Sequence, residues 1–126
     1  MEKEEILHIV KTALRAAESK KAENIQAIGI ADLSVLADYF VICSGTSSTQ
    51  IKAIADEVEY QLDQQQIMPH HIEGKSSGWI CMDYGSVVVH IFTEKERAFF
   101  DLERLWRDGE ILDTEKLLAE DEANGL

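Results

Sequence analysis

The sequence is short of proline, cysteine and basic residues, and each shortage excludes a class of protein. Its 126 residues include one proline, Pro69, and two cysteines, Cys43 and Cys81. Two thiols without a Cys-x-x-Cys spacing cannot form a disulfide framework, and both lie in apolar runs, where a free cysteine behaves as a small hydrophobic residue. We therefore expect a reducing, cytoplasmic environment.

Long apolar runs are also missing. No stretch approaches the roughly 18 consecutive apolar residues that a membrane-spanning helix needs. Residues 1–5 are acidic and polar, unlike the basic and apolar start of a secretory signal. We expect no membrane partner.

Basic residues are outnumbered, with 12 Lys and Arg against 24 Asp and Glu and a formal net charge of −12. Binding of free nucleic acid requires clustered Lys and Arg for the phosphates, so this balance argues against it. An acidic surface favours solubility and a faster encounter with basic partners. The excess is largest in residues 107–126, which hold seven acids and two bases.

Three stretches have the apolar spacing of helices. The first covers residues 3–20, and the second begins at Ser47 or Ser48, since either hydroxyl can cap a helix. The third begins with the capping-box pattern Thr93-Glu-Lys-Glu96 and ends at Gly109. Its apolar positions are Ala98, Phe99, Leu102, Leu105 and Trp106.

The apolar runs between these helices predict strands. Tyr39–Cys43 is apolar throughout, which is typical of a strand in the middle of a sheet. Residues 67–73 contain Pro69, which cannot donate to a ladder, so we expect them at an edge. Residues 79–82 and 87–92 are separated by four residues, a spacing that suits a tight hairpin. A further short strand is expected within residues 24–30.

The resulting order, α β β α β β β α, predicts an α/β fold with one mixed sheet of about five strands flanked by helices. We expect a single domain over residues 1–109. Residues 110–126 are predicted to form an acidic, partly disordered C-terminal tail, with one weak helical patch at Leu117 and Leu118.

Catalytic patterns are not found, so we expect no enzyme, no catalytic residue and no cofactor. The loop Gly45–Ser48 lies between a strand and a helix and can present backbone N–H groups to an anion, but it lacks both glycine-rich phosphate motifs. A nucleotidyltransferase would need paired carboxylates for two metal ions, whereas Asp83 stands alone. His70 and His71 are adjacent on a predicted strand and point to opposite faces, so no metal site is expected. A nucleotide-binding role for the loop is the alternative to a simple helix cap.

One segment, residues 73–85, combines large aromatic residues, charges and flexible glycines. Aromatic side chains beside a few charges are typical of interface hot spots. Trp79 and Tyr84 suit core or turn positions as well as an interface, so composition leaves both interpretations open. The candidate partner-binding residues are Glu73, Lys75, Trp79, Met82, Asp83 and Tyr84.

Several long motifs occur in a fixed order between residues 6 and 108. They are Ala37-Asp-Tyr-Phe-Val-Ile-Cys-Ser-Gly-Thr-Ser47, Ile54-Ala-Asp-Glu-Val58, Glu73-Gly74, Trp79 with Asp83-Tyr-Gly85, Val88-Val-His-Ile-Phe92 and Asp101-Leu-Glu-Arg-Leu-Trp106. In these motifs the sequence resembles the ribosomal silencing factor family, also called the Iojap or RsfS family. Position 86 is Ser where the family pattern has Asp, and position 77 offers Ser next to a glycine.

The resemblance implies a nucleotidyltransferase-like fold without catalytic carboxylates. It also implies that the protein binds large-subunit ribosomal protein fourteen and sterically blocks association of the large and small ribosomal subunits, repressing translation under nutrient limitation. A homodimer of the free protein is compatible with the resemblance.

The implied complex gives each candidate residue a role. Glu73 and Asp83 would meet Lys or Arg of the partner, and Lys75 would meet an acid or a phosphate. Trp79, Met82 and Tyr84 would form the apolar centre of the contact.

Overall fold

The fold is known from a computed structural model that describes residues 2–123, with the backbone alone for residues 121–123. The elements follow one another as α1 (Lys3–Ser19), β1 (Glu23–Gly29), β2 (Tyr39–Gly45), α2 (Ser48–Asp63), β3 (His71–Glu73), β4 (Trp79–Asp83), β5 (Val87–Thr93), α3 (Glu94–Phe100), α4 (Leu102–Leu105), β6 (Glu110–Ile111) and α5 (Thr114–Ala123). No helix among the described residues is long and apolar enough to cross a bilayer.

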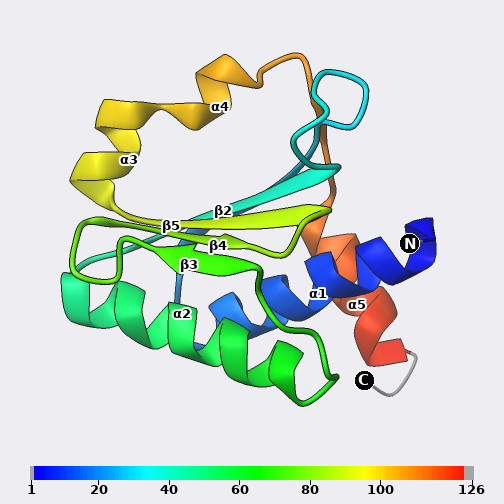
Figure 1. The fold of residues 1–126 in the computed structure, drawn as a ribbon, viewed down its shortest axis with the longest axis horizontal. Helices are drawn as coiled ribbons and strands as arrows, with labels where there is room; N and C mark the ends of the chain where they lie inside the picture. The colour runs from blue at the N-terminus through cyan, green and yellow to red at the C-terminus, as the bar shows by residue number, and fades with distance from the viewer. Residues whose placement is uncertain (1, 124–126) are drawn as a thin grey trace.

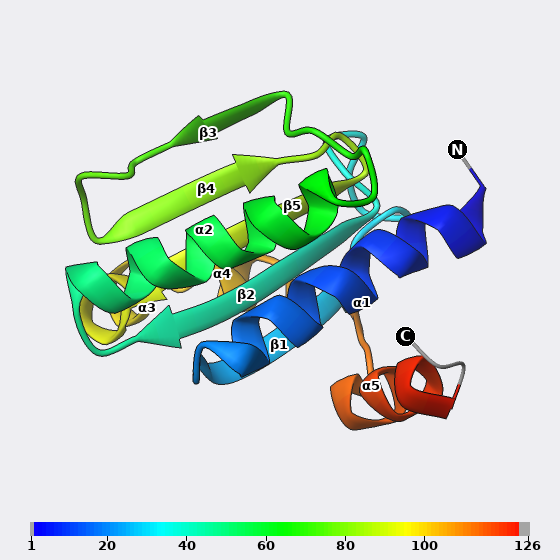
Figure 2. The same ribbon diagram turned by 90° about the horizontal axis from the view of Figure 1, so that it is seen from below.

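The strands form one mixed sheet in the order β3-β4-β5-β2-β1-β6. The central pair, β2 and β5, is parallel, and the other neighbours are antiparallel. Figure 1 shows α1 and α2 on one face of the sheet and α3 and α4 on the other. Figure 2 shows α1 and α2 side by side under the strands, with α5 beyond α1.

Two apolar clusters fill the two faces. The larger one joins α1 and α2 to the sheet and includes Leu14, Ile54 and Val89, all fully buried. The smaller one lies under α4 and includes Phe40, Phe92 and Leu102. Strand β2 is buried along its whole length because it has a neighbour on each side and a cluster on each face, as the sequence predicted.

Two turn predictions are confirmed in detail. The Ser47 hydroxyl caps α2 by accepting a hydrogen bond from the backbone N–H of Gln50 at 3.1 Å. The hairpin between β4 and β5 closes through a bond from the N–H of Tyr84 to the carbonyl of Val87, with Gly85 at a φ of +84°, where a side chain would be strained.

The third predicted helix is two short helices, because Asp101 adopts a left-handed conformation with φ at +49° and breaks the chain direction. The predicted capping box is wrong, since the Thr93 side chain makes no cap bond. A methyl group at Gly78 would meet Thr93 and Glu96, so these two side chains lie against the loop before β4 instead. Of the predicted apolar positions, Leu102 alone is buried; Trp106 is half-buried and the other three are exposed.

The predicted separate tail is wrong for residues 110–123. Glu110 and Ile111 pair with Gly29 and Ile28 of β1, which adds a sixth strand to the sheet. Helix α5 then lies against α1, with Leu117 and Leu118 packed on the larger cluster, so the weak helical patch is confirmed. The remainder of the predicted tail, residues 124–126, lies outside the described residues.

Candidate partner-binding surface

Strand β4 sends alternate side chains to opposite faces of the sheet. Ile80 and Met82 point to the face covered by α1 and α2, while Trp79, Cys81 and Asp83 point to the other. Met82 is fully buried and Tyr84 is 4% exposed, both within the larger cluster. The prediction that these two side chains form an exposed apolar centre is therefore wrong, because they face the helices.

Trp79 is half-buried and fixed in place on the less covered face. Its indole Nε1 donates a hydrogen bond to Nδ1 of His90 at 3.1 Å. Its ring centroid lies 5.0 Å from that of Phe92 and 4.5 Å from that of Phe100. These contacts hold the indole between β5 and α3 as a rigid platform.

Further rings continue this packing under α3 and α4. We call the group the aromatic cluster; its members are Phe40, Trp79, His90, Phe92, Phe100 and Trp106. Its outer edge reaches the surface at Phe99, which is 78% exposed and packs on Phe100 with the ring centroids 5.1 Å apart. Leu105 on α4 is 72% exposed. Exposed apolar side chains next to a packed cluster are typical of a binding surface.

Sequence reasoning missed Phe99, Phe100 and Leu105 as surface residues, because it assigned this stretch to the buried side of one helix. A signal was present. Two consecutive phenylalanines on a helix are about 100° apart around its axis, so one of them tends to lie outside a narrow apolar stripe.

Arg97 holds α3 and α4 in position over the sheet. Its guanidinium is almost buried, and Nη1 donates to the carbonyl of Asn24 at 2.7 Å and to Oγ of Ser44 at 2.9 Å. Its Nε donates to Oε2 of Glu103 on α4 at 3.0 Å. One side chain thus joins β1, β2, α3 and α4, which fixes the exposed edge of the aromatic cluster.

Beside the aromatic cluster lies an acidic strip, formed by Glu73 on β3 and Asp83 on β4 with His71 between them. His71 pairs in register with Asp83 on the same face of the sheet. Its Nε2 lies 3.6 Å from Oδ2 of Asp83 and 3.9 Å from Oε1 of Glu73. When His71 is neutral, the strip carries two negative charges.

Lys75 is not part of this group. It lies in the loop between β3 and β4, and its Nζ is 3.7 Å from Oε1 of Glu59 on α2. The structure therefore brings Glu73, Trp79 and Asp83 together on one face and directs Lys75 towards the helices.

The thiols and the predicted anion loop offer no reaction chemistry. Burial, followed by the charges of Asp83 and Glu73, raises the pKa of Cys81 to about 11, so its thiol stays protonated. In the Gly45–Ser48 loop the N–H of Thr46 is taken by Oε1 of Gln50 at 2.6 Å. No cluster of three or more His, Cys, Asp or Glu in the part of the chain that the structure describes can hold a metal ion.

Comparisons with known proteins identify the family of the chain. A family model described as "Ribosomal silencing factor during starvation" matches residues 3–125. A ribosomal silencing factor of Bacillus subtilis is 42% identical over 106 residues, which cover 83% of this chain and 90% of the relative. One from Halalkalibacterium halodurans is 37% identical, covering 94% and 100%.

The fold has a solved counterpart. The crystal structure of a protein from Chromobacterium violaceum superposes with a TM-score of 0.79 at 33% identity, covering 84% of this chain and 87% of that one. The family is regulatory and not enzymatic. With the match extending over nearly its whole length, the chain belongs to the ribosomal silencing factor family.

Proposed function

We propose that the chain binds the large ribosomal subunit through ribosomal protein fourteen and blocks its association with the small subunit. The observation that carries the proposal is the exposed apolar edge formed by Phe99 and Phe100, with Leu105 also exposed on the next helix, α4. This edge continues from Trp79 on the same face of the sheet as the acidic strip.

The two parts of the surface suit a basic protein partner. Apolar side chains on a rigid platform lose little conformational entropy on binding, and aromatic anchors often contribute much of the affinity. The carboxylates of Glu73 and Asp83 can pair with Lys or Arg of the partner and accelerate the encounter. We assign the partner contacts to these residues and Trp79, with Met82 and Tyr84 supporting the sheet from beneath.

Blocking then follows from size alone. A compact chain of this length has a radius of gyration of roughly 14 Å. A body of that size, bound where two ribosomal subunits meet, keeps them apart without any chemical step. Translation falls while the site is occupied. We place this repression in the cytoplasm, under nutrient limitation.

Sedimentation through a sucrose gradient tests both halves of the proposal. Purified large and small subunits are mixed under conditions that favour joining, with and without the chain. We expect the chain to migrate with the large subunit and the peak of joined ribosomes to shrink in proportion. A chain that stays at the top of the gradient contradicts the binding step, and a bound chain with undiminished joining contradicts the steric mechanism.

A further inference from the structure

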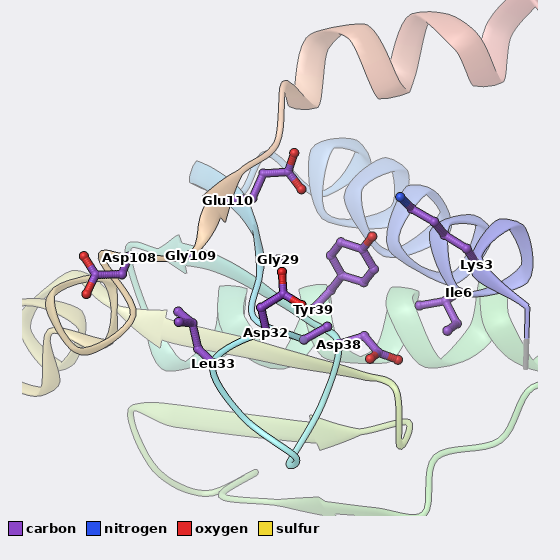
Figure 3. A pocket seen from close by; sticks show the side chains of 11 residues that line it. Lys3, Ile6, Gly29, Asp32, Leu33, Asp38, Tyr39, Asp108, Gly109 and Glu110 are labelled. Carbon is purple, nitrogen blue, oxygen red and sulfur yellow. The ribbon is translucent and has the colours of Figure 1, made fainter.

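A second site is lined by residues that do not belong to the proposed docking surface. A cavity of about 620 Å³ opens where the start of α1, the loop after β1 and the chain entering β6 meet. Figure 3 shows it with Tyr39 near its centre. Its charged lining residues are Asp32, Asp38, Asp108, Glu110 and Lys3.

Tyr39 gives this cavity a specific polar group. Its side chain is only 8% exposed, with the ring packed in the larger cluster. Its hydroxyl reaches the cavity, as Figure 3 shows, and has no hydrogen-bond partner among the described residues. Because the hydroxyl opens on the cavity, it is available to a group that enters there.

Two carboxylates act on that phenol. Burial, followed by the charges of Glu110 and Asp38, raises the pKa of Tyr39, so the hydroxyl stays protonated and neutral. A methyl group placed on Gly29 would lie 3.4 Å from Cε1 of Tyr39 and 3.5 Å from Oε1 of Glu110. Glycine at this position therefore leaves space between the ring and the carboxylate.

The charge in the cavity is not balanced from within the described chain. None of the four acidic side chains makes an ion pair with a described residue. The one basic residue in the lining, Lys3, is exposed and likewise has no ion pair there. An organic cation entering the cavity would meet several acceptors at once.

We propose that this cavity binds the guanidinium or ammonium group of an arginine or lysine side chain presented by a basic protein. A guanidinium can donate to the carboxylates of Asp38 and Glu110 and to the oxygen of the Tyr39 hydroxyl. The aliphatic stem would lie against the exposed Leu33 in the lining of the cavity. That this basic protein is the ribosomal partner rests on the proposed function. The assignment of a guanidinium or ammonium group to the cavity does not rest on it.

Two probes that differ only in charge test the cavity directly. The ¹⁵N-labelled full chain is titrated with Nα-acetyl-arginine methylamide and with its uncharged citrulline analogue, and the amide signals of Gly29 and Gly109 are followed. We expect saturable shifts with the arginine compound alone. The double variant D38N/E110Q should weaken this binding by roughly tenfold or more.

The control is D63N/E18Q, which removes the same charge from exposed positions outside the cavity and should bind like the wild type. The proposal would be overturned by equal shifts with both probes, by shifts that do not saturate, or by an unchanged affinity of D38N/E110Q for the arginine compound. Spermidine forms a third arm: saturation at a much lower concentration than the arginine compound would assign the cavity to free polyamines instead, which also overturns it.

Sedimentation with large subunits separates this proposal from the proposed function. Binding of the arginine probe without binding to large subunits keeps the cavity assignment and contradicts the proposed function. If the wild type and D38N/E110Q bind large subunits equally, while the control pair confirms that charge loss elsewhere has no effect, the cavity does not receive a side chain of that partner.

Discussion

The indole of Trp79 and the imidazole of His90 form one hydrogen-bonded unit in the aromatic cluster. Nε1 of Trp79 donates to Nδ1 of His90, which places the proton of the neutral imidazole on Nε2. His90 is 5% exposed, and its Nε2 has no partner in the described part of the chain. The platform under the proposed docking surface therefore depends on a neutral histidine.

This neutral histidine predicts a loss of stability in mild acid. Burial lowers the pKa of His90 from 6.5 to about 4. As the pH falls from 6.5 towards 4, the unfolded chain takes up a proton that the folded chain refuses, and the free energy of unfolding falls by on the order of 3 kcal/mol. Below about pH 4 both states are protonated and this contribution levels off.

Urea unfolding of wild type and H90N at pH 7 and pH 5 checks this prediction. Asparagine can still accept from Trp79 but does not titrate, so the variant should lose less stability than the wild type between the two values. The carboxylates contribute equally to both proteins. Identical pH dependence of the wild type and H90N would contradict the assignment.

Removal of Arg97 should destabilise the fold and loosen the docking surface. R97M leaves Glu103, Ser44 and the Asn24 carbonyl without their charged donor, and we expect the free energy of unfolding to fall by about 2–3 kcal/mol. The expected loss of stability is moderate because Glu103 is partly open to solvent. K95M, an exposed change on the same helix, should be nearly neutral, and equal denaturant midpoints for the two variants would rule out this role.

Tyr84 should behave as a core residue and not as a contact. Its hydroxyl is buried without a partner among the described residues, so Y84F should change stability by less than about 1 kcal/mol. Y84A should cost about 3 kcal/mol or more, because it leaves a cavity in the larger cluster. Folded Y84F should bind large subunits like the wild type. Weakened binding by Y84F would return Tyr84 to the interface.

The exposed apolar edge should determine affinity without supporting the fold. F99A/L105A removes two exposed side chains, so its melting temperature should stay close to that of the wild type while its affinity for large subunits drops tenfold or more, roughly 1.4 kcal/mol or more. The matched control is Y60A/M68A, which removes comparably exposed apolar groups on and after α2. Equal affinities of the two double variants would place the interface elsewhere.

Helix α5 should contribute to stability through its apolar residues. Deleting residues 114–126 exposes the part of α1 and the larger cluster that Leu117 and Leu118 cover, and we expect a loss of about 2 kcal/mol in urea unfolding. K11Q should cost less than about 1 kcal/mol, since its partner Glu120 is half exposed. A deletion with wild-type stability would show that α5 is dispensable for the fold.

Much of the architecture follows from local patterns in the sequence. The apolar stripes of α1 and α2, the continuous run of β2, the Ser47 cap and the Gly85 hairpin are each specified within a few residues. The long family motifs also fix the class of protein. Helix α3 was harder to predict, because Asp101 in a left-handed conformation leaves no periodic signal.

The sequence alone determined helices α1 and α2, the central strand β2, the hairpin of β4 and β5, and the family, because apolar periodicity and motif order are local properties of the chain. Tertiary structure decided which side of the sheet each residue of β4 faces, and so placed Trp79 and Asp83 outward and Met82 inward. It also brought Tyr39 and Glu110, 71 positions apart, into one cavity. Such groupings depend on how strands pair and how helices pack. Both are determined jointly by residues that lie far apart in the sequence.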